Sequence, residues 1–104
     1  MTVYVDDMRA PLGRMVMCHM VADTDDELHA MARQLGLPRR YHQAPPKVRN
    51  SHYDICLAKR VRAVELGAVQ ITARQLAAMC RQRRETGSLG TPPANLTAGT
   101  LFHG

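Results

Sequence analysis

The chain has 104 residues, a hydrophobic fraction of 45% and a formal net charge of +5, with a pI near 9.6. This length accommodates one domain with one modest core, and the sequence contains neither a membrane-length apolar run nor a signal-peptide pattern. We therefore expect a cytoplasmic globular protein with no membrane segment. Its positive charge favours nucleic acid, nucleotides or an acidic protein partner, although solvated Arg side chains on helices would give the same charge.

Aromatic residues are scarce, so the core must be filled by aliphatic residues and by several of the seven methionines. This composition is compatible with a homodimer whose two subunits share one core. The three cysteines, Cys18, Cys56 and Cys80, form no CxxC pair, which argues against a disulfide framework and against a cysteine-rich zinc site.

The first two predicted elements are strands. Val3–Val5 is β-branched and aromatic and ends abruptly at two carboxylates, Asp6 and Asp7. Residues 8–14 contain a proline and a glycine and are predicted to form a loop. Residues 15–22 form a short apolar run, which favours a buried strand.

The first helix is predicted to begin after Thr24, because Thr24 and Glu27 have the spacing of a capping box. Apolar residues then recur at i, i+3, i+4 and i+7 from Leu28 and define one buried face. Gly36 is a natural left-handed helix stop, and Pro38 prevents the helix from continuing.

A basic segment follows. Residues 39–43 are predicted to form a third, polar strand, and residues 44–50 a loop that two consecutive prolines stiffen. Ser51 is predicted to cap the second helix, with Asp54 as the acidic residue of its first turn.

The second helix is expected to turn Leu57, Val61 and Val64 inward and to end at Gly67. Residues 69–71 are predicted to form a fourth strand. Thr72 and Gln75 then form a second capping-box pattern, which opens a third helix.

These elements alternate as β-β-α-β-α-β-α, which predicts a single α/β domain with a small Rossmann-like sheet over residues 1–86. From residue 87 onward glycine, proline, threonine and asparagine dominate and the periodicity is lost. Residues 87–104 are therefore predicted to form a flexible tail, or one held only by a partner.

The candidate site follows from the sheet, since open α/β sheets bind ligands beyond the carboxyl ends of their strands. The predicted catalytic residues are Asp6, Asp7, His42 and His52. An expected helix start at Ser51, with cations in the preceding loop, predicts an anion site. The predicted ligand-binding residues are Arg9, Lys47, Arg49, Ser51, Asp54 and Lys59.

A divalent metal is an open alternative, because His19, His42 and His52 offer imidazole nitrogens to combine with Asp6 or Asp54. Their spacing matches neither HxxxH nor HExxH, and the position of His19 in an apolar run is typical of a core histidine. The carboxylates after the first strand have a structural alternative as well, since they can cap the following turn or pair with a nearby arginine.

Several motifs, taken together, resemble those of a known protein family. In chain order they are VYVDDMR, ADTDDELHAMA, YHQ, SHYDI, LAKR and LGAV. Together they resemble the family of small bacterial and phage-borne proteins known as DUF4031, over roughly residues 1–84. The resemblance implies no activity, because the family has none that is settled.

Twelve positions match the family pattern, and most of them are polar. They are Asp6, Asp7, Arg9, His19, Asp23, His42, Gln43, His52, Tyr53, Asp54, Lys59 and Arg60. One departure is that members of the family carry a tryptophan and often a longer, glycine-containing insertion between the motifs matched by YHQ and SHYD.

Three functions are compatible with these features. The first is a metal-assisted hydrolysis of a phosphoester or nucleotide, with a phosphate-bearing ligand at residues 47–52. The second is a non-enzymatic inhibitor or adaptor from a phage or mobile element that acts by binding a larger protein. The third is direct DNA binding through the predicted third helix, for which a helix-turn-helix pattern is lacking.

Overall fold

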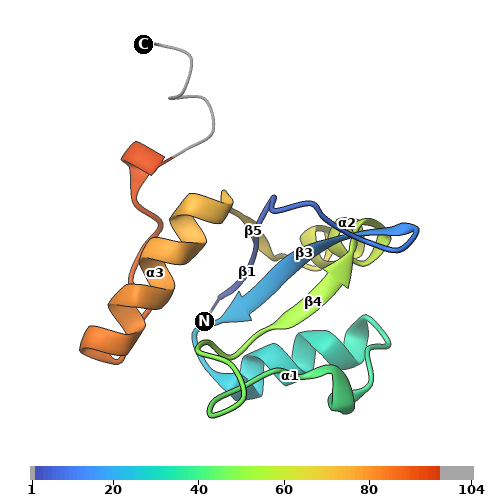
Figure 1. Cartoon of the computed structure of the whole chain (residues 1–104), viewed down its shortest axis with the longest axis horizontal. Helices are drawn as coiled ribbons and strands as arrows, with labels where there is room; N and C mark the ends of the chain where they lie inside the picture. The colour runs from blue at the N-terminus through green and yellow to red at the C-terminus, as the bar shows by residue number, and fades with distance from the viewer. Residues whose placement is uncertain (1, 97–104) are drawn as a thin grey trace.

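The computed structural model describes residues 2–96, which form one domain with a five-stranded mixed sheet and three α-helices (Figure 1). The α/β class predicted from the sequence is therefore confirmed. The strands are β1 (Val3–Val5), β2 (Ala10–Leu12), β3 (Met15–Ala22), β4 (Tyr53–Cys56) and β5 (Val69–Gln70). The helices are α1 (Asp25–Gln34), α2 (Leu57–Glu65), α3 (Ala73–Thr86) and two short 3₁₀ turns, η1 (Arg39–Tyr41) and η2 (Ala94–Leu96). None of the described helices is long and apolar enough to cross a bilayer.

β3 is the long central strand of the sheet, and it runs antiparallel to each strand that it contacts. β1 and β2 pair with two successive parts of one edge of β3, whereas β4 pairs with the other edge. β5 extends the sheet beyond β1 in the parallel direction. The pairing of β3 with β4 sets His19 directly opposite Asp54.

A bulge separates β1 from β2. The backbone N–H of Asp6 donates to the carbonyl of His19 over 3.0 Å, and regular pairing resumes where Ala10 stands opposite Met17. Residues 7–9 therefore face the single residue Cys18, and a bulge of this kind re-aims side chains. The predicted loop over residues 8–14 is wrong in part, because β2 lies within it.

Each face of the sheet has its own core. On one face, α1 and α2 cover a cluster built around Val5, Met20, Tyr53 and Ile55. On the other face, α3 covers a smaller cluster, whose members are Tyr4, Val21, Ile71, Met79, Cys80 and Leu89. Alternation of side chains along the strands explains why neighbouring residues belong to different clusters.

α3 covers only part of its face of the sheet. It lies against the β1–β5 side, away from β4 (Figure 1). The His19 and Asp54 side chains, on β3 and β4, consequently remain 34% and 39% exposed. This open part of the sheet carries the polar residues considered below.

Two local predictions over residues 39–56 are wrong. Residues 39–41 form η1 rather than a strand, and only Gln43 pairs, with His52, in an isolated bridge. Ser51 caps no helix, because residues 53–56 form β4. Apolar residues alternate along this segment, and pairing with β3 outweighs the local capping pattern.

α2 therefore begins later than predicted, at Leu57, and its inward face is rotated. Val61 is 58% exposed, whereas Ala63 is fully buried and Val64 packs against the core. The capping signals at Thr24 and Thr72 are confirmed. Each of these two hydroxyls accepts the backbone N–H three residues later.

The segment after α3 folds back onto the domain. Leu89 is only 2% exposed and belongs to the α3 core cluster. The Gln75 side chain donates to the carbonyl of Pro93 over 3.0 Å, and the Thr72 hydroxyl donates to the carbonyl of Leu96 over 2.6 Å. The first part of the predicted tail is thus packed, and residues 97–104 lie outside the described residues.

Leu89→Ala tests this packing. We expect it to lower the free energy of unfolding by about 2–5 kcal/mol, because it leaves a cavity in the small core under α3. Leu12→Ala is the matched control, since Leu12 is 59% exposed and should change stability by less than about 0.5 kcal/mol. Urea denaturation followed by circular dichroism measures both, and equal stabilities of the two variants would contradict the packing.

Candidate metal centre

Three side chains on the open part of the sheet point their donor atoms at one another. The Asp54 Oδ1 atom lies 3.4 Å from Nε2 of His52 and 3.7 Å from Nε2 of His19. All three donor atoms fall within 4.8 Å of one another. His19 comes from β3, Asp54 from β4, and His52 immediately precedes β4.

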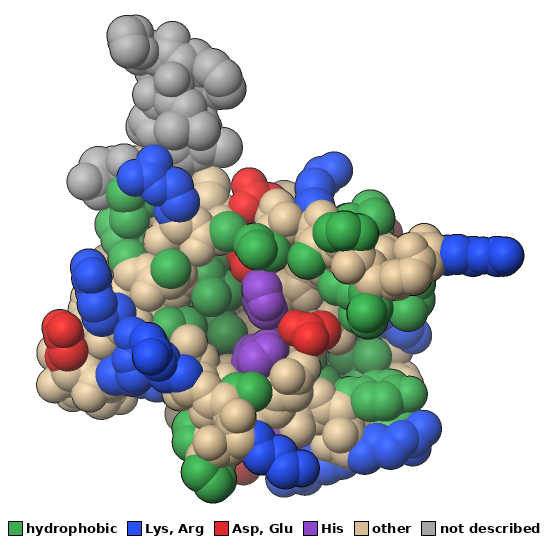
Figure 2. Space-filling model, viewed as in Figure 1, with side chains coloured by type: hydrophobic (Ala, Val, Ile, Leu, Met, Phe, Trp, Pro, Cys, Tyr) green, Lys and Arg blue, Asp and Glu red, His purple; other side chains and the backbone are tan. Residues whose placement is uncertain are grey.

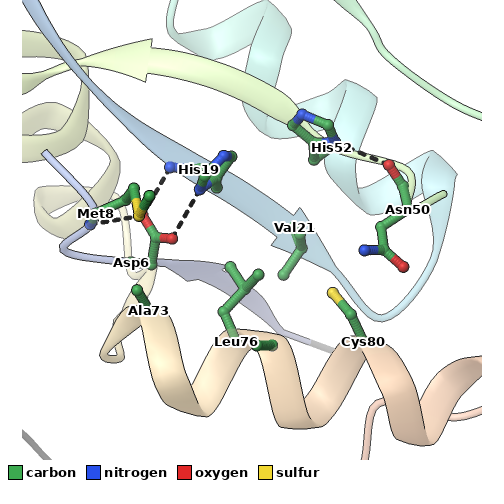
Figure 3. A pocket seen from close by; sticks show the side chains of 10 residues that line it. Asp6, Met8, His19, Val21, Asn50, His52, Ala73, Leu76 and Cys80 are labelled. Atoms are coloured by element: carbon green, nitrogen blue, oxygen red, sulfur yellow. Dashed lines mark hydrogen bonds and ion pairs between the residues drawn. The ribbon is translucent and has the colours of Figure 1, made fainter. Parts of the chain in front are cut away.

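The direction of the His19 ring is fixed by Asp6. The Asp6 carboxylate is only 1% exposed, and its Oδ2 atom accepts the Nδ1–H of His19 over 2.8 Å (Figure 3). Its Oδ1 atom accepts the backbone N–H of His19 at 2.7 Å and of Met8 at 3.2 Å. A neutral imidazole that donates from Nδ1 presents the lone pair of Nε2 to the cluster.

His52 and Asp54 are oriented in the same way by outer partners. The Nδ1–H of His52 donates to the carbonyl of Asn50 over 2.8 Å, which leaves its Nε2 atom free. The Gln43 amide donates to Oδ2 of Asp54 over 2.8 Å, which leaves Oδ1 free. We call the three atoms that face one another, Nε2 of His19, Nε2 of His52 and Oδ1 of Asp54, the inner donor atoms. Each is held in place by a hydrogen bond at the far side of its own group, as in known metal sites.

Three acceptors that face one another repel unless a positive charge lies among them. The two distances to Oδ1 of Asp54 exceed the usual 2.7–3.2 Å range of an N–H···O hydrogen bond. A proton on one imidazole relieves part of this repulsion. A metal cation bound by all three groups relieves all of it, and imidazole and carboxylate are common ligands of transition metals.

The Asp6–His19 pair shifts the pKa of both groups. The hydrogen bond to Asp6 raises the pKa of His19, and burial offsets only part of that rise. Burial by itself would raise the pKa of Asp6, but hydrogen bonds from the ring and backbone of His19 and from the backbone of Met8 outweigh it, so the pKa is lowered. Asp6 is therefore ionised at neutral pH and attracts a positive charge on the imidazole or beyond it.

A hollow of about 270 Å³ lies between the two histidines and α3, and we call it the α3 hollow. Besides Asp6, His19 and His52, its lining includes Met8, Val21, Asn50, Leu76, Ala77 and Cys80. Figure 3 shows the α3 side chains opposite the two imidazole rings. Figure 2 shows two histidines and a carboxylate exposed side by side, next to a recess with hydrophobic walls.

Other predicted site residues lie apart from this cluster. The Asp7 carboxylate accepts the backbone N–H of Ala73 over 2.8 Å, at the start of α3. It lines a separate hollow of about 400 Å³ together with Arg9 and Arg60. The Lys59 ammonium donates to the carbonyl of Leu35 over 2.6 Å, so it caps the C-terminal end of α1.

His42 and Ser51 belong to a second polar cluster, on the α1 side. The Ser51 hydroxyl donates its one proton to Asp25 over 2.7 Å, so its oxygen accepts from Nε2 of His42 over 2.7 Å. A serine whose proton is donated to a carboxylate is not activated by its histidine. The His29 ring stacks edge-on against His42 and bonds to the Tyr53 hydroxyl over 2.8 Å.

The basic residues of the predicted loop are exposed beside the centre. Lys47 and Arg49 precede Asn50, which lines the α3 hollow, and the Arg84 guanidinium donates to the Asn50 side chain over 2.8 Å. The structure thus brings together Asp6, His52 and Asp54 from the predicted set. His19 is missing from the predicted catalytic and ligand-binding residues. Side chains alternate along a strand, and this alternation would have placed His19 on the other face of the sheet from the buried Cys18 and Met20.

The fold and the cluster together define a small α/β protein with a candidate metal centre. A family model described as Protein of unknown function (DUF4031) matches residues 3–83, so the chain belongs to this family and the resemblance of its motifs is confirmed. Searches of curated proteins and of solved structures found no match.

Asp6→Asn tests the electrostatic link to His19. In the chelator-treated protein we expect the pKa of His19 to lie above its ordinary value, about 6.5, and to fall in the variant, because burial then acts without the carboxylate. The ion pair stabilises the fold below pH about 6.5, and this contribution is lost as the pH rises through the raised pKa of His19.

Histidine titration by two-dimensional NMR measures the effect. His29 is an internal control, because burial lowers its pKa and it lies outside the Asp6 pair. A His19 pKa that is the same in the two proteins would contradict the proposed link.

Proposed function

We propose that the chain binds one divalent transition-metal ion through His19, His52 and Asp54 and uses it to hydrolyse a phosphoester. The single observation that supports this most is the set of three inner donor atoms, each fixed from behind by its own hydrogen-bond partner. A polar cluster formed by chance would not require all three groups to present a free lone pair to the same point.

The geometry suits a tetrahedral ion such as Zn²⁺. Metal–ligand bonds of 2.0–2.1 Å place neighbouring ligand atoms about 3.3 Å apart in a tetrahedron. The two distances to Oδ1 of Asp54, 3.4 and 3.7 Å, are close to that value. Small movements of the half-exposed side chains of His19 and Asp54 would complete the site.

Hydrolysis follows from the number of ligands. Three protein ligands leave a coordination position open, and an ion held in this way lowers the pKa of a bound water toward 7. The same ion polarises an oxygen of the substrate. Water is the only co-reactant that this chemistry requires, and the α3 hollow beside the donor atoms supplies room for a substrate group.

The charge of the chain supports a phosphate-bearing substrate. The net charge is +5, and exposed cations at Lys47 and Arg49 lie on the loop that leads into Asn50 and His52. Such a field draws anions toward the open part of the sheet. The alternative of an adaptor without catalysis has no comparably specific feature among residues 2–96.

Metal binding is the first test. Isothermal titration of the metal-free protein with Zn²⁺ and with Mn²⁺ should give one site per chain for at least one of them. We expect His52→Ala to weaken binding more than about 100-fold, since it removes a ligand, and Asp6→Asn to weaken it about 10–100-fold, since it removes the partner that fixes the His19 tautomer. Asp26→Asn, an exposed carboxylate on α1, is the matched control and should bind normally.

Hydrolysis is the second test. The metal-loaded protein should release p-nitrophenol from p-nitrophenyl phosphate or its diester, lose the activity with EDTA and regain it when metal is restored. Asp54→Asn should reduce the rate at least about 100-fold, whereas Asp26→Asn should leave it unchanged. Metal binding without any hydrolysis of either ester would refute the catalytic part of the proposal and leave the metal site standing.

A further inference from the structure

A second hollow adjoins the metal centre, and no residue of α3 lines it. Its volume is about 170 Å³, and we call it the hairpin hollow because β2 and β3 form most of its walls. Besides His19 and Asp54, it is lined by Ala10, Pro11, Leu12, Met17 and Cys18.

The metal centre borders both hollows. His52 borders the α3 hollow, Asp54 borders the hairpin hollow, and His19 borders both. Each hollow by itself is smaller than the 300–1,000 Å³ or so that is usual for a small-molecule site, whereas the two together fall within that range. A substrate that uses the available space therefore extends to both sides of the ion.

The charges of the residues that line the two hollows limit the charge of the substrate. Among the described residues, neither hollow is lined by a lysine or an arginine, and Asp6 and Asp54 already place two carboxylates there. A phosphate monoester carries nearly two negative charges at neutral pH, whereas a diester carries one. Beside two carboxylates and one divalent ion, the single negative charge of a diester is repelled less than the nearly double charge of a monoester.

From these observations we infer that the substrate is a phosphodiester, with one organic group in the α3 hollow and the other in the hairpin hollow. This inference rests on the proposed function and adds the class of ester to it. The mostly apolar lining of both hollows, from Met8 and Leu76 to Leu12 and Met17, suits flat or apolar groups such as a nucleobase, a sugar edge or an aryl ring.

The reaction needs only water. An ion held by His19, His52 and Asp54 would activate a water, which could then lose one proton to the solvent while its oxygen forms a new bond to phosphorus. The bond from phosphorus to one ester oxygen breaks, and that oxygen leaves with the bonding electron pair and takes up a proton from water. The products are a phosphate monoester and an alcohol.

A single-stranded nucleic acid and a small diester share this chemistry. The exposed cations Lys47, Arg49 and Arg84 line neither hollow, so they could contact only phosphates other than the cleaved one. The arms of the experiment must therefore separate a polymer from a small molecule.

The experiment compares three substrates with the full chain loaded with Mn²⁺ or Zn²⁺. They are p-nitrophenyl phosphate, bis(p-nitrophenyl) phosphate and a short single-stranded oligonucleotide. We expect kcat/KM for the diester to exceed that for the monoester at least about 10-fold, as for the loss of one well-placed substrate group. Cleavage of the oligonucleotide that weakens with salt would identify the polymer, and cleavage of the small diester alone would identify a small molecule.

Ala77→Phe partly fills the α3 hollow without entering the core, because Ala77 is an exposed residue of α3. It should lower diester hydrolysis about 10-fold and reduce the preference for the diester over the monoester. Ala58→Phe, the same change at an exposed position of α2, is the matched control and should alter neither rate.

The outcomes separate the two proposals. Metal-dependent hydrolysis with no preference for the diester, or with diester hydrolysis unaffected by Ala77→Phe, overturns the inference and leaves the proposed function in place. Absence of metal-dependent hydrolysis of every ester removes the catalytic part of the proposed function and the inference together. The comparison of substrates uses the unmodified chain, so it decides the question even if Ala77→Phe does not fold.

Discussion

The hydrogen bond between Asp6 and His19 is the contact on which the rest of the open sheet depends. A carboxylate that is 1% exposed would be strongly destabilising without partners, and Asp6 has three, all from His19 and Met8. Together these bonds fix the pairing of β1 with β3, hold the bulge that follows β1, and set the direction of one imidazole. The same buried charge therefore contributes to the fold and orients the inner donor atom of His19.

The site is open because α3 covers only one side of its sheet face. Its core partners come from β1, from the end of β3 and from the residue after β5, whereas β4 has no helix above it. The opposite face, under α1 and α2, is closed by a larger apolar cluster. One face thus supplies most of the hydrophobic stabilisation, and this allows polar side chains to remain half exposed on the other.

Local sequence signals predicted the structure correctly where no strand pairing overrides them, and failed where it does. The strands at Val3–Val5 and 15–22 and the caps at Thr24 and Thr72 depend on neighbouring residues, and each is confirmed. The Ser51-x-x-Asp54 pattern is local too, but pairing with β3 decides the conformation of residues 53–56. His19 resembles a core histidine until the strand pairing is known, since that pairing brings both Asp6 and Asp54 to its ring.

In the loop before His52, residues that are candidates for catalysis or ligand binding in the sequence instead position other residues. Ser51 ties the loop to α1 through Asp25, and Asn50 ties it to α3 through Arg84. Between these two anchors, the carbonyl of Asn50 accepts from the ring of His52 and fixes its free nitrogen. The isolated bridge between Gln43 and His52 adds a third restraint, and the Gln43 side chain orients Asp54 as well. The polar residues that flank this loop therefore hold two of the three inner donor atoms in place, which explains why so many of them surround a site that few of them enter.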